Sequence, residues 1–82
     1  MNKQEKLIEL GYKRILHFYM VEYIKYYKKY EFIIEIHFRR NNQIVGYVSN
    51  LYGFEKQQDI DELQEAYNIL QQDLKKLEQC LF

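Results

Sequence analysis

The sequence contains no proline, tryptophan or threonine, and it has only three glycines and one serine. Proline and glycine most often interrupt regular backbone structure, so their scarcity predicts long helices and strands. The 82 residues correspond to a single small domain. Because 48% of the residues are apolar and 17% are aromatic, we expect a folded chain rather than a disordered one.

A single cysteine, Cys80, excludes an internal disulfide framework and disfavours a cysteine-based metal site. A chain without disulfides is compatible with a reducing compartment, so we expect a cytoplasmic protein. No apolar run approaches the roughly 18 residues of a membrane-spanning helix, and the N-terminal residues lack the apolar core of a signal peptide. We therefore expect no membrane partner.

Side chains suited to catalysis are equally scarce. The two histidines, His17 and His37, do not have metal-ligand spacing, and Ser49 is the only serine and lies outside any nucleophile pattern. There is no glycine-rich phosphate loop, and the acidic residues between 55 and 65 lack the order of a calcium loop. We expect a protein that is not an enzyme and has no cofactor, metal or catalytic residues.

The net charge is zero, but the charges are unevenly distributed. Residues 13–40 carry seven Lys and Arg against three Glu, whereas residues 54–82 carry three Lys against seven Asp and Glu. One interpretation is two solvated faces. The other is that one face meets a charged partner, or that two copies associate head to tail.

Residues 57–82 contain an unbroken apolar repeat with alternating spacings of three and four. Its members are Ile60, Leu63, Tyr67, Leu70, Leu74, Leu77 and Leu81. This spacing is typical of an amphipathic helix that packs against a partner surface. It predicts a long helix over about residues 58–81.

The first half of the chain predicts a short helix followed by strands. Residues 2–10 suit a helix with Asn2 as N-cap, Glu5 as its capping-box partner and Gly11 just after its end. Residues 12–30 are ambiguous, because their periodicity favours a helix while their β-branched and aromatic residues favour a strand. Of the two, we choose a strand near residues 21–27.

Residues 31–39 alternate between apolar and polar side chains, which predicts a strand with one face on the core. The next residues, 40–43, include Asn41 and Asn42 and predict a turn. A returning strand follows at residues 44–49, in which Gly46 indicates a bulge or the close approach of another segment.

These segments predict an α+β fold of order α-β-β-β-α in one domain spanning residues 1–82. A three-stranded antiparallel sheet within about residues 20–49 packs against the long C-terminal helix, with the short helix at one edge. The expected core consists of Leu7, Leu10, Ile24, Phe32, Ile34, Ile36, Phe38, Val45, Ile60, Leu63, Tyr67, Leu70 and Leu74.

Four stretches follow one another along the chain: Leu10-Gly11-Tyr12-Lys13, Ile24-x-Tyr26, Ile34-x-Ile36-x-Phe38, and Glu62-Leu63-x-x-Ala66 leading to Asp73-Leu74. Their order and spacing resemble those of small uncharacterised proteins encoded by phages and other mobile elements of low-GC Gram-positive bacteria. The resemblance implies an α-β-β-β-α unit without catalytic residues. Genes of this context include inhibitors of host defence, such as anti-CRISPR proteins.

Tyrosine and arginine are enriched where proteins meet, and eight of the nine tyrosines lie between residues 12 and 52. Either these rings wrap the core with wet hydroxyls, or some of them dock on a partner. The expected partner-binding residues are Tyr23, Lys25, Tyr27, Lys28, Lys29, Tyr30, Arg39, Arg40, Tyr47 and Tyr52. We expect a non-catalytic protein-binding module that resembles an anti-CRISPR inhibitor and acts in the host cytoplasm.

The alternative is a small nucleic-acid-binding regulator that uses the same basic and aromatic residues. The order α-β-β-β-α is also that of double-stranded RNA-binding domains, and tyrosines can stack on bases. Two features argue against this alternative. The closing helix begins with acidic residues, and the neutral chain would gain little from counterion release.

The apolar repeat from Ile60 to Leu81 would extend over roughly 32 Å of helix, whereas a typical strand covers only about 17–20 Å. The end of the repeat would therefore extend beyond the sheet. This overhang predicts a homodimer through the C-terminal helix. The expected self-association residues are Tyr67, Leu74, Leu77, Leu81 and Phe82.

Overall fold

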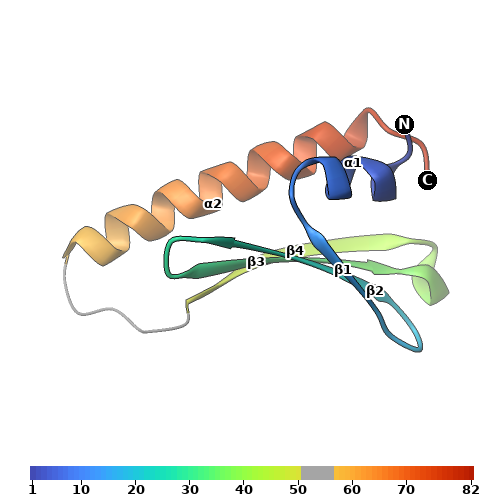
Figure 1. Ribbon diagram of the computed structural model, residues 1–82, viewed down its shortest axis with the longest axis horizontal. Coiled ribbons are helices and arrows are strands. Elements are labelled where there is room, and N and C mark those ends of the chain that lie inside the picture. Colours follow the sequence, from blue (N-terminus) through green and yellow to red (C-terminus); the bar gives the residue numbers. More distant parts are fainter. Residues whose placement is uncertain (51–56) are drawn as a thin grey trace.

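The computed structural model describes residues 1–50 and 57–82, with the side chains of all of these except residues 57–59. The described elements are α1 (Lys3–Glu9), β1 (Lys13–Leu16), β2 (Val21–Tyr27), β3 (Tyr30–His37), the 3-10 turn η1 (Phe38–Arg40), β4 (Gln43–Asn50) and α2 (Gln57–Glu78). Figure 1 shows two layers, with both helices on one side of a twisted sheet and the two chain ends close together. The predicted α+β class is confirmed.

The sheet has four strands, so the prediction of three is wrong. Its strands run antiparallel in the order β1-β2-β3-β4. The additional strand, β1, was not predicted because its four residues are all exposed and do not alternate between apolar and polar. It forms by pairing with β2, from Lys13↔Ile24 to Leu16↔Val21. The strand chosen at residues 21–27 is confirmed by β2.

The alternating strand ends two residues earlier than the predicted range of 31–39. β3 stops at His37, and Phe38, which was expected in the core, begins η1 and is exposed. The predicted turn follows directly. Asn41 and Asn42 both adopt positive φ, at 55° and 58°, a conformation that asparagine tolerates better than most residues.

α2 covers β3 and β4, and Gly46 marks the closest approach between helix and sheet. A Cβ atom added to Gly46 would lie 3.0 Å from Cδ1 of Leu74. The sequence-based expectation of a close approach at this glycine is confirmed. In the sheet register, Gly46 pairs with Ile34, which in turn pairs with Tyr23, so these residues lie on the helix-facing side of the sheet.

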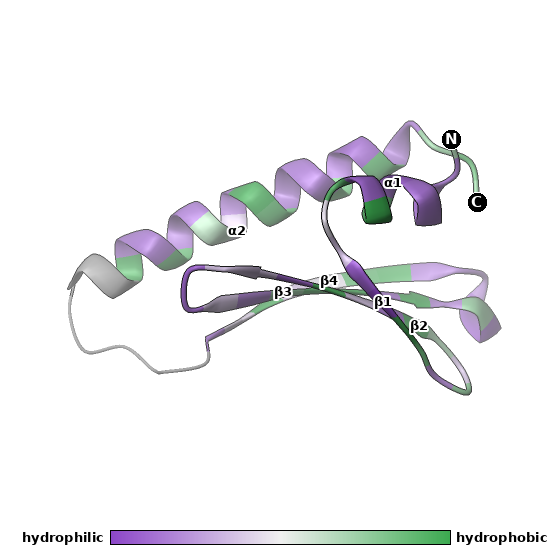
Figure 2. Cartoon of the chain, viewed as in Figure 1, coloured by the Kyte–Doolittle hydropathy of each residue, from purple (hydrophilic) through white to green (hydrophobic). Residues whose placement is uncertain are grey.

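The core lies between this side of the sheet and the two helices. Its buried residues are Leu7, Tyr12, Val21, Tyr23, Tyr30, Phe32, Ile34, Ile36, Ala66, Leu70 and Leu77. Hydrophobic and hydrophilic residues alternate along α2, as a helix with one buried side requires (Figure 2).

Several residues that were expected in the core lie outside it. Ile24 and Val45 pair in register with Ile33 and Glu35, which places them on the side of the sheet that α2 does not cover. Alternate residues of a strand face opposite sides of the sheet, and the strand register decides which set faces the helices. The apolar residues of these two strands did not indicate that register.

Two further misplacements occur on α2, where Ile60 and Tyr67 are 52% and 48% exposed. Leu70 and Leu77 of the apolar repeat are buried, but the other buried positions are Ala66 and Asp73, each one residue before a member of the repeat, so the buried side of the helix is turned relative to the apolar repeat. The inward residues are Ala66, Leu70, Asp73 and Leu77.

The helix α1 has the predicted ends. The side chain of Asn2 accepts a hydrogen bond from the Glu5 amide at 2.7 Å, and the Glu5 carboxylate accepts one from the Asn2 amide at 3.3 Å. Gly11 follows the helix with φ of 98°. A capping box and a left-handed glycine fix both ends of a helix that is too short to be stable alone.

α2 ends at Glu78, three residues before the predicted end. Beyond it, the carbonyl of Leu81 accepts a hydrogen bond from the Lys3 amide at 2.7 Å. The Lys3 ammonium donates to the carbonyls of Leu77 and Cys80, which occupies groups that a helix end leaves unpaired. The two ends of the chain are thereby tied together.

One buried carboxylate links the helix layer to the sheet. Asp73 is 4% exposed, and its Oδ2 accepts hydrogen bonds from the Tyr12 hydroxyl and the Lys25 ammonium, both at 2.8 Å. Lys25 also donates to the Leu10 carbonyl at 3.1 Å. Burial, followed by the hydrogen bond to Asp73 and its negative charge, raises the pKa of Tyr12 well above its usual range.

Candidate functional site

The side of the sheet opposite α1 and α2 is uncovered in the described part of the chain (Figure 1). We call it the outer face. The register aligns Ile15, Glu22, Glu35 and Val45 across the four strands in one row, and Lys13, Ile24, Ile33 and Tyr47 in the next. A third row contains Tyr26, Glu31 and Ser49. The outer face therefore combines apolar, aromatic and acidic side chains with one lysine, Lys13.

The apolar residues of the outer face are considerably exposed. Tyr26 is 67% exposed and Tyr47 is 40% exposed, and Ile15 and Val45 also reach solvent. A hollow of about 270 Å³ lies beside Tyr26, lined by Gly11, Lys13, Ile15, Ile24 and Lys25. Adjacent exposed apolar groups with a hollow among them are typical of an interaction surface.

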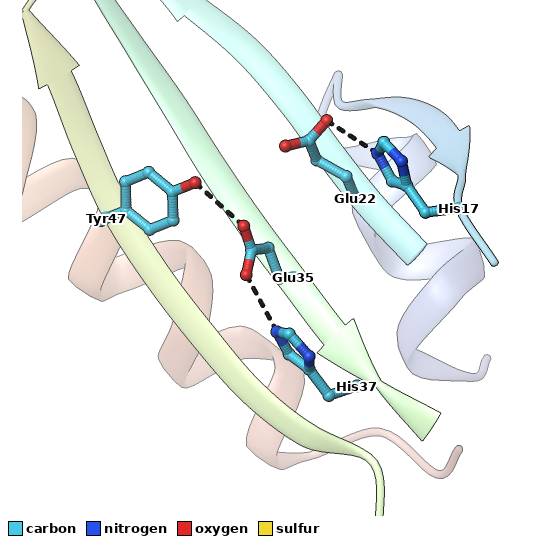
Figure 3. Close-up of polar contacts among 5 residues, drawn as sticks. All are labelled: His17, Glu22, Glu35, His37 and Tyr47. Carbon is cyan, nitrogen blue, oxygen red and sulfur yellow. Dashed lines mark hydrogen bonds and ion pairs between the residues drawn. The ribbon is translucent and has the colours of Figure 1, made fainter. Parts of the chain in front are cut away.

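Two carboxylates lie side by side on the two central strands of the outer face, near the end of β3 that leads into η1. Glu22 and Glu35 are directly opposed in the β2–β3 register. Two like charges in this position repel each other and destabilise the strand pair. Nε2 of His17 lies 3.3 Å from Glu22, and Nε2 of His37 lies 2.9 Å from Glu35. The Tyr47 hydroxyl donates to Glu35 at 2.9 Å (Figure 3). The neighbouring side chains hold both carboxylates in fixed positions.

The tyrosines of the outer face keep their protons over a wide pH range. Partial burial raises the pKa of Tyr47 to about 12, and the hydrogen bond to Glu35 and the charges of the nearby glutamates add to this effect. The hydrogen bond to Glu31 raises the pKa of Tyr26. The aligned rows of the outer face contain three glutamates, Glu22, Glu31 and Glu35, against one lysine, Lys13, so these rows carry a net negative charge.

The residues predicted to bind a partner do not form one surface. Tyr23 and Tyr30 are fully buried, so their rings are not available to a partner. Lys25 binds Asp73 beneath α2. Tyr27 donates its hydroxyl to Glu65 of α2, and Lys28 lies 3.7 Å from the same carboxylate.

The remaining basic residues lie at opposite ends of β3. Lys28 and Lys29 form the turn before β3, whereas Arg39 and Arg40 lie in η1 after it. Eight extended residues separate the two pairs, which corresponds to roughly 25 Å. Arg39 lies over the ring of Phe18, 4.8 Å from its centroid. A continuous basic patch is therefore not formed by these residues.

Of the predicted partner-binding tyrosines, Tyr47 is the one that lies exposed on the outer face, and Tyr52 falls outside the described residues. The sequence-based prediction missed Glu22, Tyr26 and Glu35. A signal was present in β3, where Glu35 and His37 alternate with buried residues. This alternation does not show how β2 and β3 are paired, and it is the pairing that brings Glu22 beside Glu35.

The predicted self-association residues are also dispersed. Leu77 is 1% exposed and belongs to the core of the single chain, so its side chain is not available for self-association. Leu74 packs against Gly46. Leu81 and Phe82 are exposed at the end of the chain, where the Lys3 ammonium lies 5.0 Å from the Phe82 ring centroid.

Two properties of the described residues bear on other classes of function. Residues 1–50 and 60–82 contain no group of three or more His, Cys, Asp or Glu side chains that could hold a metal ion. In the same part of the chain, no helix is long and apolar enough to cross a membrane. Comparison with protein-family models, curated proteins and solved structures finds no match to this chain.

Proposed function

We propose that this protein is a non-catalytic protein-binding module that docks through its outer face and blocks the function of its partner. The observation that carries the proposal is the group of exposed apolar and aromatic side chains on the uncovered side of the sheet, Ile15, Tyr26, Val45 and Tyr47. Burying such groups against a partner supplies the main favourable term in protein association.

The charges of the outer face favour a partner with basic side chains. Glu22 and Glu35 face each other, and a partner's arginine or lysine would relieve their repulsion while its apolar groups cover Tyr26 and Tyr47. Tyrosine rings also bind cationic side chains over their faces. The proposed partner is therefore a protein surface that combines apolar and basic residues.

The same charges disfavour the nucleic-acid alternative. The carboxylates of the outer face would repel phosphates, and the Lys28–Lys29 and Arg39–Arg40 pairs lie too far apart to act as one patch. The resemblance to phage and mobile-element proteins supports a more specific role. We propose that the target is a cytoplasmic host defence effector, which the protein inhibits by occupying its surface.

A capture experiment with matched variants tests the proposal. Immobilised protein is exposed to nuclease-treated lysate of a Gram-positive bacterium, and the retained proteins are identified by mass spectrometry. The outer-face variant is Ile15→Ser/Tyr26→Ser. The control variant is Asn68→Ser/Gln72→Ser, which changes two exposed positions on α2. We expect one defined protein that the wild type and the control retain and the outer-face variant loses.

Two results would contradict the proposal. Equal retention of that protein by the outer-face variant would place the docking surface elsewhere. Retention of nucleic acid from a parallel lysate that is not treated with nuclease, with binding that falls steeply between about 50 and 200 mM salt, would indicate phosphate recognition instead.

A further inference from the structure

The two edges of the sheet are protected very differently. β1 is four residues long and carries Lys13 and Arg14, whereas β4 is eight residues long and contains no charged residue and no proline. Short length, charge and proline are the usual means by which an edge strand avoids pairing with another chain. β4 has none of these, and alternate residues direct their backbone N–H and C=O groups away from β3.

A groove of about 450 Å³ runs between β4 and α2. It is lined by Gly46, Tyr47, Val48, Ile60, Leu63, Gln64 and Tyr67. None of these residues is charged, although α2 as a whole is acidic. On α2 the lining residues Ile60, Gln64 and Tyr67 recur at helical spacing, so the helix presents a neutral flank beside the neutral strand.

This neutrality favours a second copy of the same chain as the occupant. A two-fold contact places a surface against itself, so any net charge would repel its own copy. A surface without charge avoids that repulsion. A charged partner, in contrast, would find no group in this groove to pair with its charges.

We propose that two copies of this chain associate through antiparallel pairing of their β4 strands, which joins the two sheets into one. A two-fold axis perpendicular to the sheet keeps both α2 helices on the same side. This axis also requires one residue of β4 to pair with the same residue of the second copy. For the two strands to overlap along their whole length, that residue is at the centre of β4, which is Gly46 or Tyr47. The flanks bearing Ile60 and Tyr67 then lie toward each other across the axis, while the outer face remains uncovered.

Sedimentation equilibrium from micromolar to millimolar concentration tests the pairing. We expect the wild type to form a species of twice the 10.3 kDa chain mass. The variant Val45→Lys/Tyr47→Lys adds two charges to the edge strand and should raise the dissociation constant about a hundredfold. The control Ile15→Lys/Tyr26→Lys adds the same charge to the same side of the sheet, away from β4, and should leave it unchanged.

Hydrogen exchange on the wild type gives a second measurement that does not depend on any variant. Amides of β4 should exchange more slowly as concentration rises, while those of β1 should not. The proposal is overturned if the wild type is a monomer throughout, or if both lysine variants dissociate equally. It is also overturned if the β4 variant stays dimeric while Leu81→Glu/Phe82→Glu dissociates.

Discussion

Asp73 is a charged residue that the fold places in the buried core. It lies in an otherwise apolar buried line of α2, yet it is a carboxylate. A buried charge is tolerated only when it is paired and hydrogen-bonded, and here Lys25 and Tyr12 provide both. Because Lys25 also reaches solvent, the two partners of the ion pair are not equivalent.

Replacing Lys25 should therefore lower the stability of the fold by a different amount than replacing Asp73. We expect Lys25→Met to lower the free energy of unfolding by about 3 kcal/mol, because it leaves a buried carboxylate without its cation. Asp73→Asn should cost only about 1–2 kcal/mol, because the Lys25 ammonium retains access to water and to the Leu10 carbonyl. Urea denaturation of both variants measures the difference.

The double variant Lys25→Met/Asp73→Leu provides the control. It removes both charges, so it should recover much of the stability that Lys25→Met loses. Equal costs for the two single variants would show that the pair is not buried in the way described.

Some residue-level features could be predicted because their causes are local. The positive φ of Gly11 and the left-handed Asn41 and Asn42 follow from the conformations that these residue types tolerate. The exposure of individual tyrosines could not be predicted in this way. Tyr23 and Tyr26 are three residues apart in one strand and so face opposite sides of the sheet, but which of them is buried depends on the side that the helices cover.

At the scale of elements, α2 and β3 have strong periodic patterns and could be located from the sequence. β1 lacks such a pattern, and only its pairing with β2 makes it a strand. The end of α2 could not be placed either, because the contact between Lys3 and Leu81 fixes it from the other end of the chain. Non-local contacts therefore account for both errors.

The contact between α2 and the segment after α1 predicts a specific sensitivity to alkaline pH. An unfolded tyrosine ionises near pH 10, whereas burial raises the pKa of Tyr12 in the folded protein. The folded state then binds more protons above pH ~10, so stability is present below that pH and falls as the pH rises. We expect a slope of up to about 1.4 kcal/mol per pH unit from this residue.

Urea denaturation above and below pH ~10 measures this slope. Tyr12→Phe should flatten it, whereas Tyr19→Phe, at an exposed position, should not. The pKa of about 12 at Tyr47 adds a smaller contribution of the same sign. An unchanged slope in Tyr12→Phe would contradict the assigned role of its hydroxyl.

For the whole molecule, the decisive feature is that both helices cover one side of the sheet and leave the other open (Figure 1). The sequence indicated an uneven distribution of charge, but the fold divides the basic residues that were expected to bind a partner between an ion pair under α2 and two distant turns. It places acidic and aromatic residues on the open side instead. The composition of this surface depends on how the strands pair and on which side the helices pack. Neither can be read from the sequence of one segment.

The most direct test of this account is to map where the captured partner binds. Nuclear magnetic resonance spectra of the isotope-labelled protein are recorded as the purified partner is added. We predict that the perturbed amides lie on the outer face, around Glu22, Tyr26, Glu35 and Tyr47. Perturbations confined to the Lys28–Lys29 turn and η1, with the outer face unaffected, would contradict it.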